Sequence, residues 1–445
     1  MIRGCLLLVL SGWSACATDY VVGPGKPLAR VNDVPWERLE AGDRVRIHWR
    51  EKPYREKFVL CCRGTEERPI VIEGVPGSKG RLPVIDGRDA TTRREVNYWG
   101  EERAVIKIGG ANRPADTMPA HIILRGLEIR SGRRPFFFTG RKGRTAYRKN
   151  AASIYIEKGE HIQIDSCRIH DSGNGIITAP NTRELVVSRC HIFGNGVERS
   201  ILEHNAYISG TGVTFRFNRF DPLRPGCGGS NFKTRCLALN FHCNWVEGGN
   251  RCLDLVDGGK PSPTDVTMVW GNVLLKGDGG NNQVIHFGGD SGKVANYRPL
   301  LLLHHNTVAS RRRGNTVLIR RSTDRQKVFC ANNIVYGDPR LGVLCLQDRG
   351  VSKADQFSGN WFSAGWRHSP GVPNQIGLNK VNHSGTDPGF VDVLRGDFRL
   401  RSDAVGRGRA IDAGISNLIR AEYVPHRGSQ PRRAVRDLGA FEFQR

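Results

Sequence analysis

The sequence has no long apolar segment able to cross a membrane and no long stretch with amphipathic helical periodicity. The N-terminal apolar run, residues 5–10 (CLLLVL), is too short to span a bilayer. CxxC pairs and the His/Cys spacings of zinc sites are also missing, which argues against a zinc domain. These absences leave a β-rich protein without a membrane span, and 54 glycines and 22 prolines favour many turns.

The first 17 residues have the pattern of a secretory signal. Arg3 is basic, residues 5–10 are apolar, and Ala15-Cys16-Ala17 is a small-residue cleavage site. We therefore expect a secreted or periplasmic protein cleaved after Ala17. Lipid attachment at Cys16 is the alternative, although Trp13 fits that motif poorly. Export permits disulfides among the remaining ten of 12 cysteines.

Acidic residues are scarce relative to basic ones. The chain has 43 Asp and Glu against 67 Lys and Arg, a formal net charge of +24, which indicates an anionic partner. The basic residues are scattered rather than grouped in a nucleic-acid-binding module, so we expect no nucleic acid. An anionic polysaccharide is the more suitable partner for an exported protein. We also expect the protein to be a monomer. An arginine-rich genomic composition is the other explanation of the charge.

An asparagine column returns about every 27 residues, which is typical of a solenoid. Its members are Asn218, Asn244, Asn272, Asn306, Asn333 and Asn360. Stacked asparagines bond from coil to coil at a tight turn, so this column is structural. Cys190 and Cys167 continue it upstream. We predict that they stack on adjacent coils about 5 Å apart, as a disulfide or as free thiols.

The predicted fold is all-β: a single-stranded, right-handed parallel β-helix of the pectate-lyase-like kind, with an asparagine ladder. We predict a signal peptide over residues 1–17, the β-helix over 18–384, and a closing segment packed on it over 385–445. Residues 91–120 and 130–150 are polar, basic and aromatic, and we interpret them as excursions from the coil. The closing segment is expected to cover the exposed end of the core.

One row of outward-facing residues could carry chemistry. Strand alternation predicts that Tyr207, Lys233, Asp254, His286 and Arg320 lie on successive coils about 4.8 Å apart. Tyr207, Lys233 and Asp254 would then lie within about 10 Å of each other. The candidate residues that flank this row are His204, Asn205, Asn231, Arg235, Arg251 and Asp257.

These residue types suit β-elimination of a uronic acid polysaccharide. That reaction needs a cation on the carboxylate, a base for the α-proton and an acid for the leaving oxygen. Lys233 is the predicted base, and arginines 235, 251 and 320 are the candidates for holding the carboxylate. Tyr207 or His204 is the predicted acid. We assign Asn205, Asn231, Asp254, Asp257 and His286 to substrate binding.

The stretch 204–259 resembles a motif set of exported bacterial right-handed β-helix proteins. It contains His204-Asn205-x-Tyr207-Ile208, Asn231-x-Lys233-Thr234-Arg235 and Leu253-Asp254-Leu255-x-Asp257-Gly258-Gly259. In architecture the chain resembles the chondroitinase B and alginate lyase family of polysaccharide lyases. The resemblance implies a lysine base, an arginine from a neighbouring coil, and Ca²⁺ on the uronate.

This chain departs from the family pattern in two places. Residues 228–232 (GGSNF) contain no acidic calcium ligand, so arginine is expected to neutralise the carboxylate instead. The family's arginine slot reads Leu253-Asp254-Leu255-Val256 here, and Arg251 comes earlier. The alternatives are a glycoside hydrolase using Asp254 and Asp257, a C5-epimerase with the same initial chemistry, and a non-catalytic cell-surface polysaccharide binder.

Overall fold

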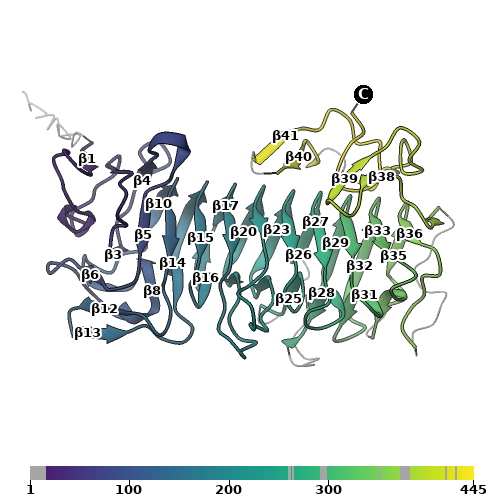
Figure 1. Ribbon diagram of the computed structural model, residues 1–445, viewed down its shortest axis with the longest axis horizontal. Coiled ribbons are helices and arrows are strands. Elements are labelled where there is room, and N and C mark those ends of the chain that lie inside the picture. Colours follow the sequence, from purple (N-terminus) through teal and green to yellow (C-terminus); the bar gives the residue numbers. More distant parts are fainter. Residues whose placement is uncertain are drawn as a thin grey trace, which may run out of the picture.

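The chain winds in successive coils along one long axis (Figure 1), and strands of each coil pair in parallel with those of the next. The computed structural model describes residues 17–258, 262, 265–290, 298–349, 352–370, 381–415, 418–425 and 428–444. The predicted signal segment lies outside the described residues except for Ala17. Helices among the described residues are three short 3₁₀ turns, η1 (Val31–Asp33), η2 (Ser78–Gly80) and η3 (Glu101–Arg103). The described part of the chain contains no helix long and apolar enough to span a membrane.

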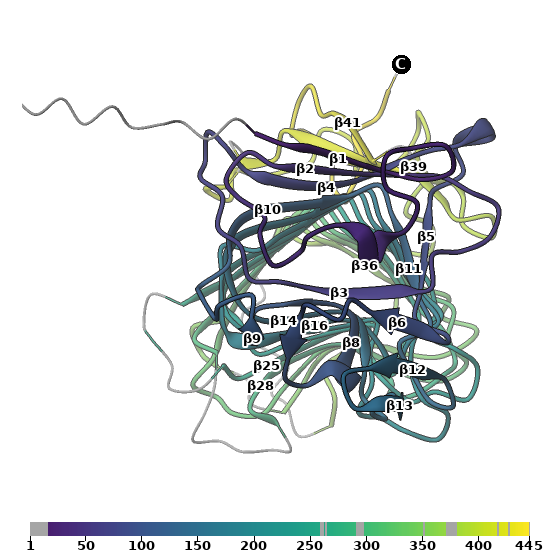
Figure 2. The same cartoon turned by 90° about the vertical axis from the view of Figure 1, so that its left-hand side faces the viewer.

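Three sheets run along the coil (Figure 2), and we number them in the order in which each coil meets them. Sheet 1 contains β1 (Asp19–Val22), β2 (Arg44–His48), β4 (Ile70–Val75), β10 (Ala120–Arg125), the end of β14 (Ala152–Asp165), β17 (Val186–Ser188), β20 (Thr211–Arg216), β23 (Leu237–His242), β26 (Val266–Trp270), β29 (Leu300–His304), β32 (Lys327–Ala331) and β35 (Gln356–Ser358). Sheet 2 contains β5 (Val84–Asp86), β11 (Glu128–Arg130), β15 (Arg168–His170), β18 (His191–Phe193), β21 (Arg219–Phe220), β24 (Trp245–Glu247), β27 (Val273–Lys276), β30 (Thr307–Ser310), β33 (Ile334–Gly337), β36 (Trp361–Ser363) and β37 (His383–Gly385).

Sheet 3 lies below the other two in Figure 2 and carries the predicted site. It contains β3 (Glu56–Leu60), β8 (Ala104–Ile108), the start of β14, the start of β16 (Asn174–Arg183), β19 (Ala206–Ile208), β22 (Phe232–Thr234), β25 (Leu253–Val256), β28 (Gln283–Gly288), β31 (Thr316–Arg321) and β34 (Leu344–Asp348). Strand β8 corrects the prediction that residues 91–120 are an excursion from the coil. It pairs with β3 and β14 as part of the coil.

The remaining strands lie outside the three sheets or at their margins. They are β6 (Ala90–Thr92), β7 (Asn97–Tyr98), β9 (Ala111–Arg113), β12 (Phe137–Gly140), β13 (Gly143–Ala146), β38 (Phe390–Asp392), β39 (Asp397–Leu400), β40 (Ala421–Val424) and β41 (Gly428–Pro431). The pairs β12–β13, β38–β39 and β40–β41 are antiparallel. Parallel pairing along the three sheets confirms the predicted all-β helical coil.

The asparagine ladder is confirmed at the turn between sheets 1 and 2. The Asn272 amide donates to Asn306 Oδ1 at 2.9 Å, and the same bond recurs from Asn218 through Asn360. Asn382 extends the ladder by one step, because it accepts from Asn360 at 3.0 Å. Each asparagine oxygen also accepts a backbone N–H of the coil before it, as Asn306 does from Asn272. The ladder therefore pins the register of every coil it joins.

Cys167 and Cys190 occupy the same turn, as predicted, and both are buried free thiols. The backbone N–H of Cys190 donates to Asn218 Oδ1 at 2.9 Å, which joins the stack to the ladder. The N–H of Cys167 points at Cys190 Sγ at 3.4 Å. Of the two alternatives left open by the sequence, the structure has the thiol stack.

A second asparagine ladder lies at the turn between sheets 2 and 3. Asn195 donates to Asn205 Oδ1 at 2.9 Å, and Asn205 donates to Asn231 Oδ1 at 2.7 Å. Asn231 then donates to the Glu247 carbonyl at 2.7 Å. Asn205 and Asn231 are fully buried, and their amides are used inside this stack. The prediction that they bind substrate is therefore wrong; they shape the turn that leads into the site.

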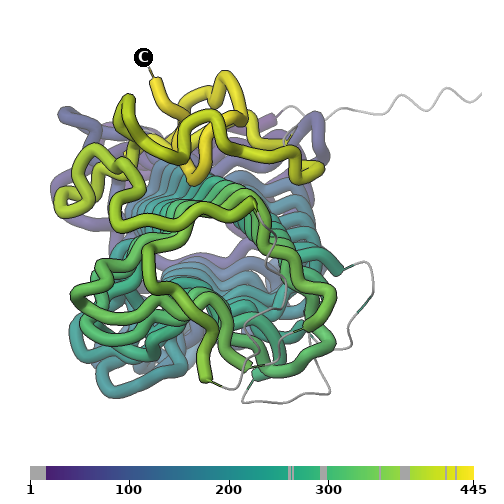
Figure 3. Tube along the Cα trace, turned by 90° about the vertical axis from the view of Figure 1, so that its right-hand side faces the viewer, coloured from purple at the N-terminus to yellow at the C-terminus, as the bar shows by residue number. Residues whose placement is uncertain are grey.

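The C-terminal segment folds back over the outer side of sheets 1 and 2 (Figure 3). This corrects the expectation that it covers the end of the core. Phe390, Phe398 and Leu438 are buried there against residues of sheet 2, including Trp245 and Ile334. Sheet 3 faces the opposite side of the coil (Figure 1). The candidate site therefore lies on the face that this segment leaves uncovered.

Candidate active site on the outer face of sheet 3

The predicted outward row exists in the register expected from the sequence. Tyr207 pairs with Lys233, Lys233 with Asp254, Asp254 with His286, and His286 with Arg320. The neighbours of Lys233 in its strand, Phe232 and Thr234, are fully buried, so alternation turns Lys233 outward. Five chemically active side chains thus follow one line across five coils.

Lys233 lies between two carboxylates. Its Nζ is 3.4 Å from Asp254 Oδ2 and 3.4 Å from Asp290 Oδ2, and its side chain keeps 14% exposure. Asp290 follows β28 and was not predicted. Burial would raise the pKa of Asp290, but Lys233 and Arg235 outweigh it and lower the pKa below its ordinary value. Asp290 is therefore a second anion that holds the lysine, beside Asp254.

Arg235 joins Tyr207 to the same cluster. Its Nε donates to Tyr207 Oη at 2.9 Å, and its Nη2 forms an ion pair with Asp290. Because the phenol oxygen accepts this bond, the O–H proton of Tyr207 is free to point elsewhere. Tyr207, Arg235, Asp290 and Lys233 thus form one continuous network.

Asp254 is the buried anchor of the cluster, with a side chain only 4% exposed. Its Oδ1 accepts from His286 Nδ1 at 2.8 Å and from Arg251 Nη1 at 3.3 Å. Burial alone would raise its pKa, but His286, Arg251 and Lys233 hold the pKa well below its usual range. Asp254 is therefore a carboxylate at neutral pH and orients three cationic or polar groups.

Asp257 is likewise engaged. Its Oδ1 accepts the backbone N–H of Asp290 at 2.8 Å and lies 3.8 Å from Arg235 Nη1. An acid in a glycosidase pair needs a carboxyl with a raised pKa, usually from an apolar surrounding. The low pKa of Asp254 and the cation beside Asp257 are the opposite arrangement, so this pair does not favour hydrolysis.

His204, predicted as an acid, is buried. Its Nδ1 accepts the backbone N–H of Ser230 at 3.0 Å, and its ring packs edge-on against Tyr207 at 5.4 Å between centroids. Burial, with Lys233 nearby, lowers its pKa to about 4. A histidine that is neutral at pH 7 is a poor proton donor, so we correct its role to support of the Tyr207 ring.

The end of the row opens into a pocket of about 290 Å³. It is lined by Arg251, His286, Asp290, Arg320, Arg321, Ser322 and Arg349. Burial, together with Arg349 and Arg251, lowers the pKa of Arg320. Crowded guanidinium groups make this pocket suitable for an anion. Ser322, in the turn after β31, was not predicted.

The calcium ion implied by the family resemblance does not fit this donor set. The carboxylates of Asp254, Asp257 and Asp290 already face Lys233, Arg235 or Arg251. Within the described ranges, no group of three or more His, Cys, Asp or Glu side chains could hold a metal. In this chain, the positive charge at the site comes from side chains.

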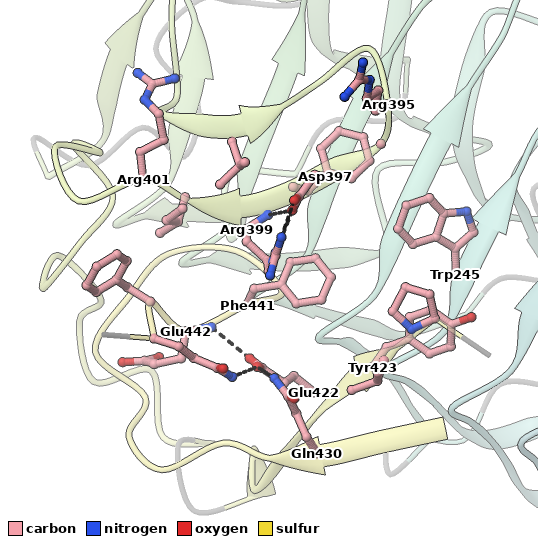
Figure 4. Close-up of a pocket in the computed structure, with 18 of the residues that line it drawn as sticks. Trp245, Arg395, Asp397, Arg399, Arg401, Glu422, Tyr423, Gln430, Phe441 and Glu442 are labelled. Carbon is pink, nitrogen blue, oxygen red and sulfur yellow. Dashed lines mark hydrogen bonds and ion pairs between the residues drawn. The ribbon is translucent and has the colours of Figure 1, made fainter. Parts of the chain in front are cut away.

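A larger cavity of about 630 Å³ lies far from this row, between the C-terminal segment and Trp245 (Figure 4). Its polar groups bond to one another. The carboxylate of Glu422 accepts from the Gln430 and Gln444 amides and from the N–H of Glu442, and Arg399 pairs with Asp397. None of the predicted site residues line it. Size alone does not make it the candidate active site.

Comparison with known proteins agrees with the coil. Residues 126–265 match the family model described as "Right handed beta helix region". No curated protein matches the sequence. Among solved structures, pectate lyase Pel9A is similar at 12% identity, with a TM-score of 0.51 over 97% of this chain and 98% of that one.

Two further solved structures match at lower similarity. A rhamnogalacturonan lyase has 13% identity and a TM-score of 0.49 over 84% of this chain and 91% of its own. An alginate lyase from Paenibacillus sp. has 11% identity and a TM-score of 0.45 over 73% of this chain and 94% of its own. At such identities the likeness concerns the fold, and the protein is a right-handed parallel β-helix, as predicted.

Proposed function

We propose that this protein is an exported lyase that cleaves an anionic, uronic-acid-containing polysaccharide by β-elimination. One observation carries the proposal: Tyr207, Lys233, Arg235 and Arg251 meet in a single network on the face of the β-helix that the C-terminal segment leaves uncovered. The similarity to polysaccharide lyases in fold and the net charge of +24 support it. Export rests on the signal pattern of residues 1–17.

Each residue has a role in this scheme. Arg251 holds the uronate carboxylate, which makes the α-proton more acidic, and Arg235 adds positive charge from the next coil. Lys233 is the base that takes that proton. The O–H of Tyr207 protonates the leaving glycosidic oxygen, and an unsaturated sugar end remains. Asp254 and Asp290 position the lysine from two sides.

The test is a panel of uronate polysaccharides followed by ultraviolet absorbance of the unsaturated product. We expect Lys233→Ala to lose at least about 100-fold in rate, the size of a general-base contribution. Lys327→Ala is the matched control, because Lys327 is an exposed lysine of β32 on sheet 1. Full activity in Lys233→Ala would contradict the assignment. New reducing ends without absorbance would indicate hydrolysis, and binding without any product would indicate a polysaccharide binder.

A further inference from the structure

Three side chains at the outer face of sheet 3, two from strands and one from a turn, lie in the order carboxylate, imidazole, hydroxyl. Asp254 Oδ1 lies 2.8 Å from His286 Nδ1, and His286 Nε2 lies 3.2 Å from Ser322 Oγ. They come from β25, from β28 and from the turn that follows β31. The β-elimination scheme does not use Ser322, and it gives His286 no proton to move.

We propose that Asp254, His286 and Ser322 form a Ser-His-Asp relay that hydrolyses an O-acyl ester carried by an anionic polysaccharide. Such a relay is recognised by geometry, with the base in hydrogen-bond reach of the nucleophile and a third group that orients the base. Both contacts are present here, on rigid neighbouring coils.

The protonation pattern suits a general base. Asp254 is a carboxylate held by Lys233 and Arg251, so in its hydrogen bond with His286 it is the acceptor. The tautomer of His286 that pairs with this acceptor has its hydrogen on Nδ1, and its Nε2 lone pair faces Ser322. Asp254 is the positioning residue of the relay, since it acts through His286.

The Ser322 hydroxyl has one proton and two acceptors within reach. Its Oγ is 2.7 Å from the Gly289 carbonyl oxygen and 3.2 Å from His286 Nε2. Rotation about the Cβ–Oγ bond moves the proton from the carbonyl to the imidazole. The contact with Gly289 also holds the oxygen in place beside the base.

The surroundings supply what an acyl transfer needs. Ser322 and His286 line the pocket of about 290 Å³, together with Arg251, Arg320 and Arg349. A guanidinium group next to the nucleophile can stabilise the oxyanion of a tetrahedral intermediate. The other guanidinium groups suit an anionic polymer that carries the ester, because Arg binds carboxylate and sulfate oxygens in a planar fork.

The reaction balances without a metal or redox partner. Ser322 Oγ attacks the ester carbonyl carbon while its proton passes to His286 Nε2. The bond from the carbonyl carbon to the sugar oxygen breaks, and that oxygen leaves with the proton. Water then attacks the acyl-serine, gives a proton to Nε2, and releases the carboxylic acid. Ser322 recovers its proton, and the enzyme is unchanged.

The experiment uses the full mature chain with two substrates, p-nitrophenyl acetate and an O-acetylated polyuronate, and measures released nitrophenol and acetate. A fluorophosphonate probe followed by mass spectrometry identifies the modified serine. We expect labelling at Ser322 and turnover of both esters. Ser322→Ala and His286→Ala should each lower the rate by at least about 1,000-fold. Ser402→Ala, at an exposed serine of the C-terminal segment, is the matched control.

Thermal unfolding of each variant separates loss of chemistry from loss of folding, and Asp254→Asn adds a functional readout. If Asp254 orients the imidazole, its variant should change the pH profile of ester hydrolysis as well as its rate. Ester turnover unchanged in Ser322→Ala, labelling of another serine, or no turnover and no labelling in the wild-type chain would each overturn the relay. The ester assay measures cleavage of the acyl bond and tests the relay, whereas the ultraviolet assay measures cleavage of the glycosidic bond and tests the lyase proposal. A negative result in one assay therefore does not decide the other.

Discussion

Sheets 2 and 3 belong to the same coils and differ in what their outer faces carry. On sheet 2 the outward row runs through Trp245, Val273, Thr307, Ile334 and Trp361, and the C-terminal segment buries it. On sheet 3 the row of neighbouring coils carries Lys233, Asp254, His286 and Arg320, and the described residues of the C-terminal segment do not cover it. Asparagine ladders of the same kind fix both rows, so the two faces share one framework. They differ in residue type: the apolar row packs against the C-terminal segment, and the charged row forms the candidate site.

The difference shows how a solenoid separates stability from chemistry. An apolar row gains free energy by attracting a covering segment, at roughly 25 cal/mol for each Å² buried. A charged row repels such a cover because desolvating it is costly, and it stays open to a polar ligand. Predictions that act on one face, on the shared framework or on one titrating side chain therefore test this separation.

The largest expected effect is on the covered face. Phe398 is buried, with its ring 5.7 Å from that of Trp245 and 5.2 Å from that of Phe390. We expect Phe398→Ala to lower the free energy of unfolding by about 4 kcal/mol, as for other buried Phe→Ala changes. Denaturant unfolding measures this change. Val391→Ala, at a residue of β38 with 48% exposure, should cost less than about 0.5 kcal/mol.

The same variant also sharpens the comparison through activity. The rate of the Lys233-dependent reaction should stay near the wild-type value in Phe398→Ala below its unfolding transition. A loss of activity in the folded variant would show that the two faces are coupled. It would contradict the separation of stability on sheet 2 from activity on sheet 3.

Much of this framework could be predicted because it repeats. The asparagine column marks one turn per coil, and period-two alternation then places Tyr207, Lys233, Asp254, His286 and Arg320 on one face of sheet 3. The strand pairing confirms that these five residues form one row. The pattern is local and is reinforced at each coil, so a misplaced strand would break the stack. The sequence analysis missed strand β8 because this five-residue strand lies among polar and basic residues.

The site was harder to predict where it leaves the strands. Asp290 and Ser322 come from turns after β28 and β31, where alternation gives no direction. Asn205 and His204 were misjudged for a related reason: side chains at the entry to a strand can turn inward, and residue type does not report depth. Only the packing shows that Asn205 is part of a second ladder.

The shared framework gives the next effect in size. Asn272 makes five side-chain bonds: its amide donates to Phe241 O, Trp270 O and Asn306 Oδ1, and its oxygen accepts from Asn244 twice. Because Asn272→Ala leaves buried partners unsatisfied, we expect a loss of about 3 kcal/mol in unfolding free energy. Denaturant unfolding measures it. Asn272→Asp keeps the acceptor but places a buried carboxylate against three oxygen atoms, so it should lose at least as much. A loss of unfolding free energy below about 0.5 kcal/mol in Asn272→Ala would mean that the ladder does not stabilise the coil.

The smallest effect comes from a single histidine of sheet 1. His242 of β23 stacks on Trp270 with ring centroids 4.3 Å apart, and burial, with Arg216 nearby, lowers its pKa to about 3. The folded state keeps this histidine neutral, whereas the unfolded chain protonates it near pH 6.5. Above pH 6.5 the histidine is neutral in both states and costs no stability. As pH falls from 6.5 toward 3, only the unfolded chain binds the proton, so the free energy of unfolding decreases. We expect about 1 kcal/mol of stability to disappear between pH 7 and 5.5, and His242→Gln should remove that part of the slope. Denaturant unfolding at the two pH values, with the exposed-residue variant His161→Gln as control, checks it; an unchanged slope in His242→Gln would contradict the assignment.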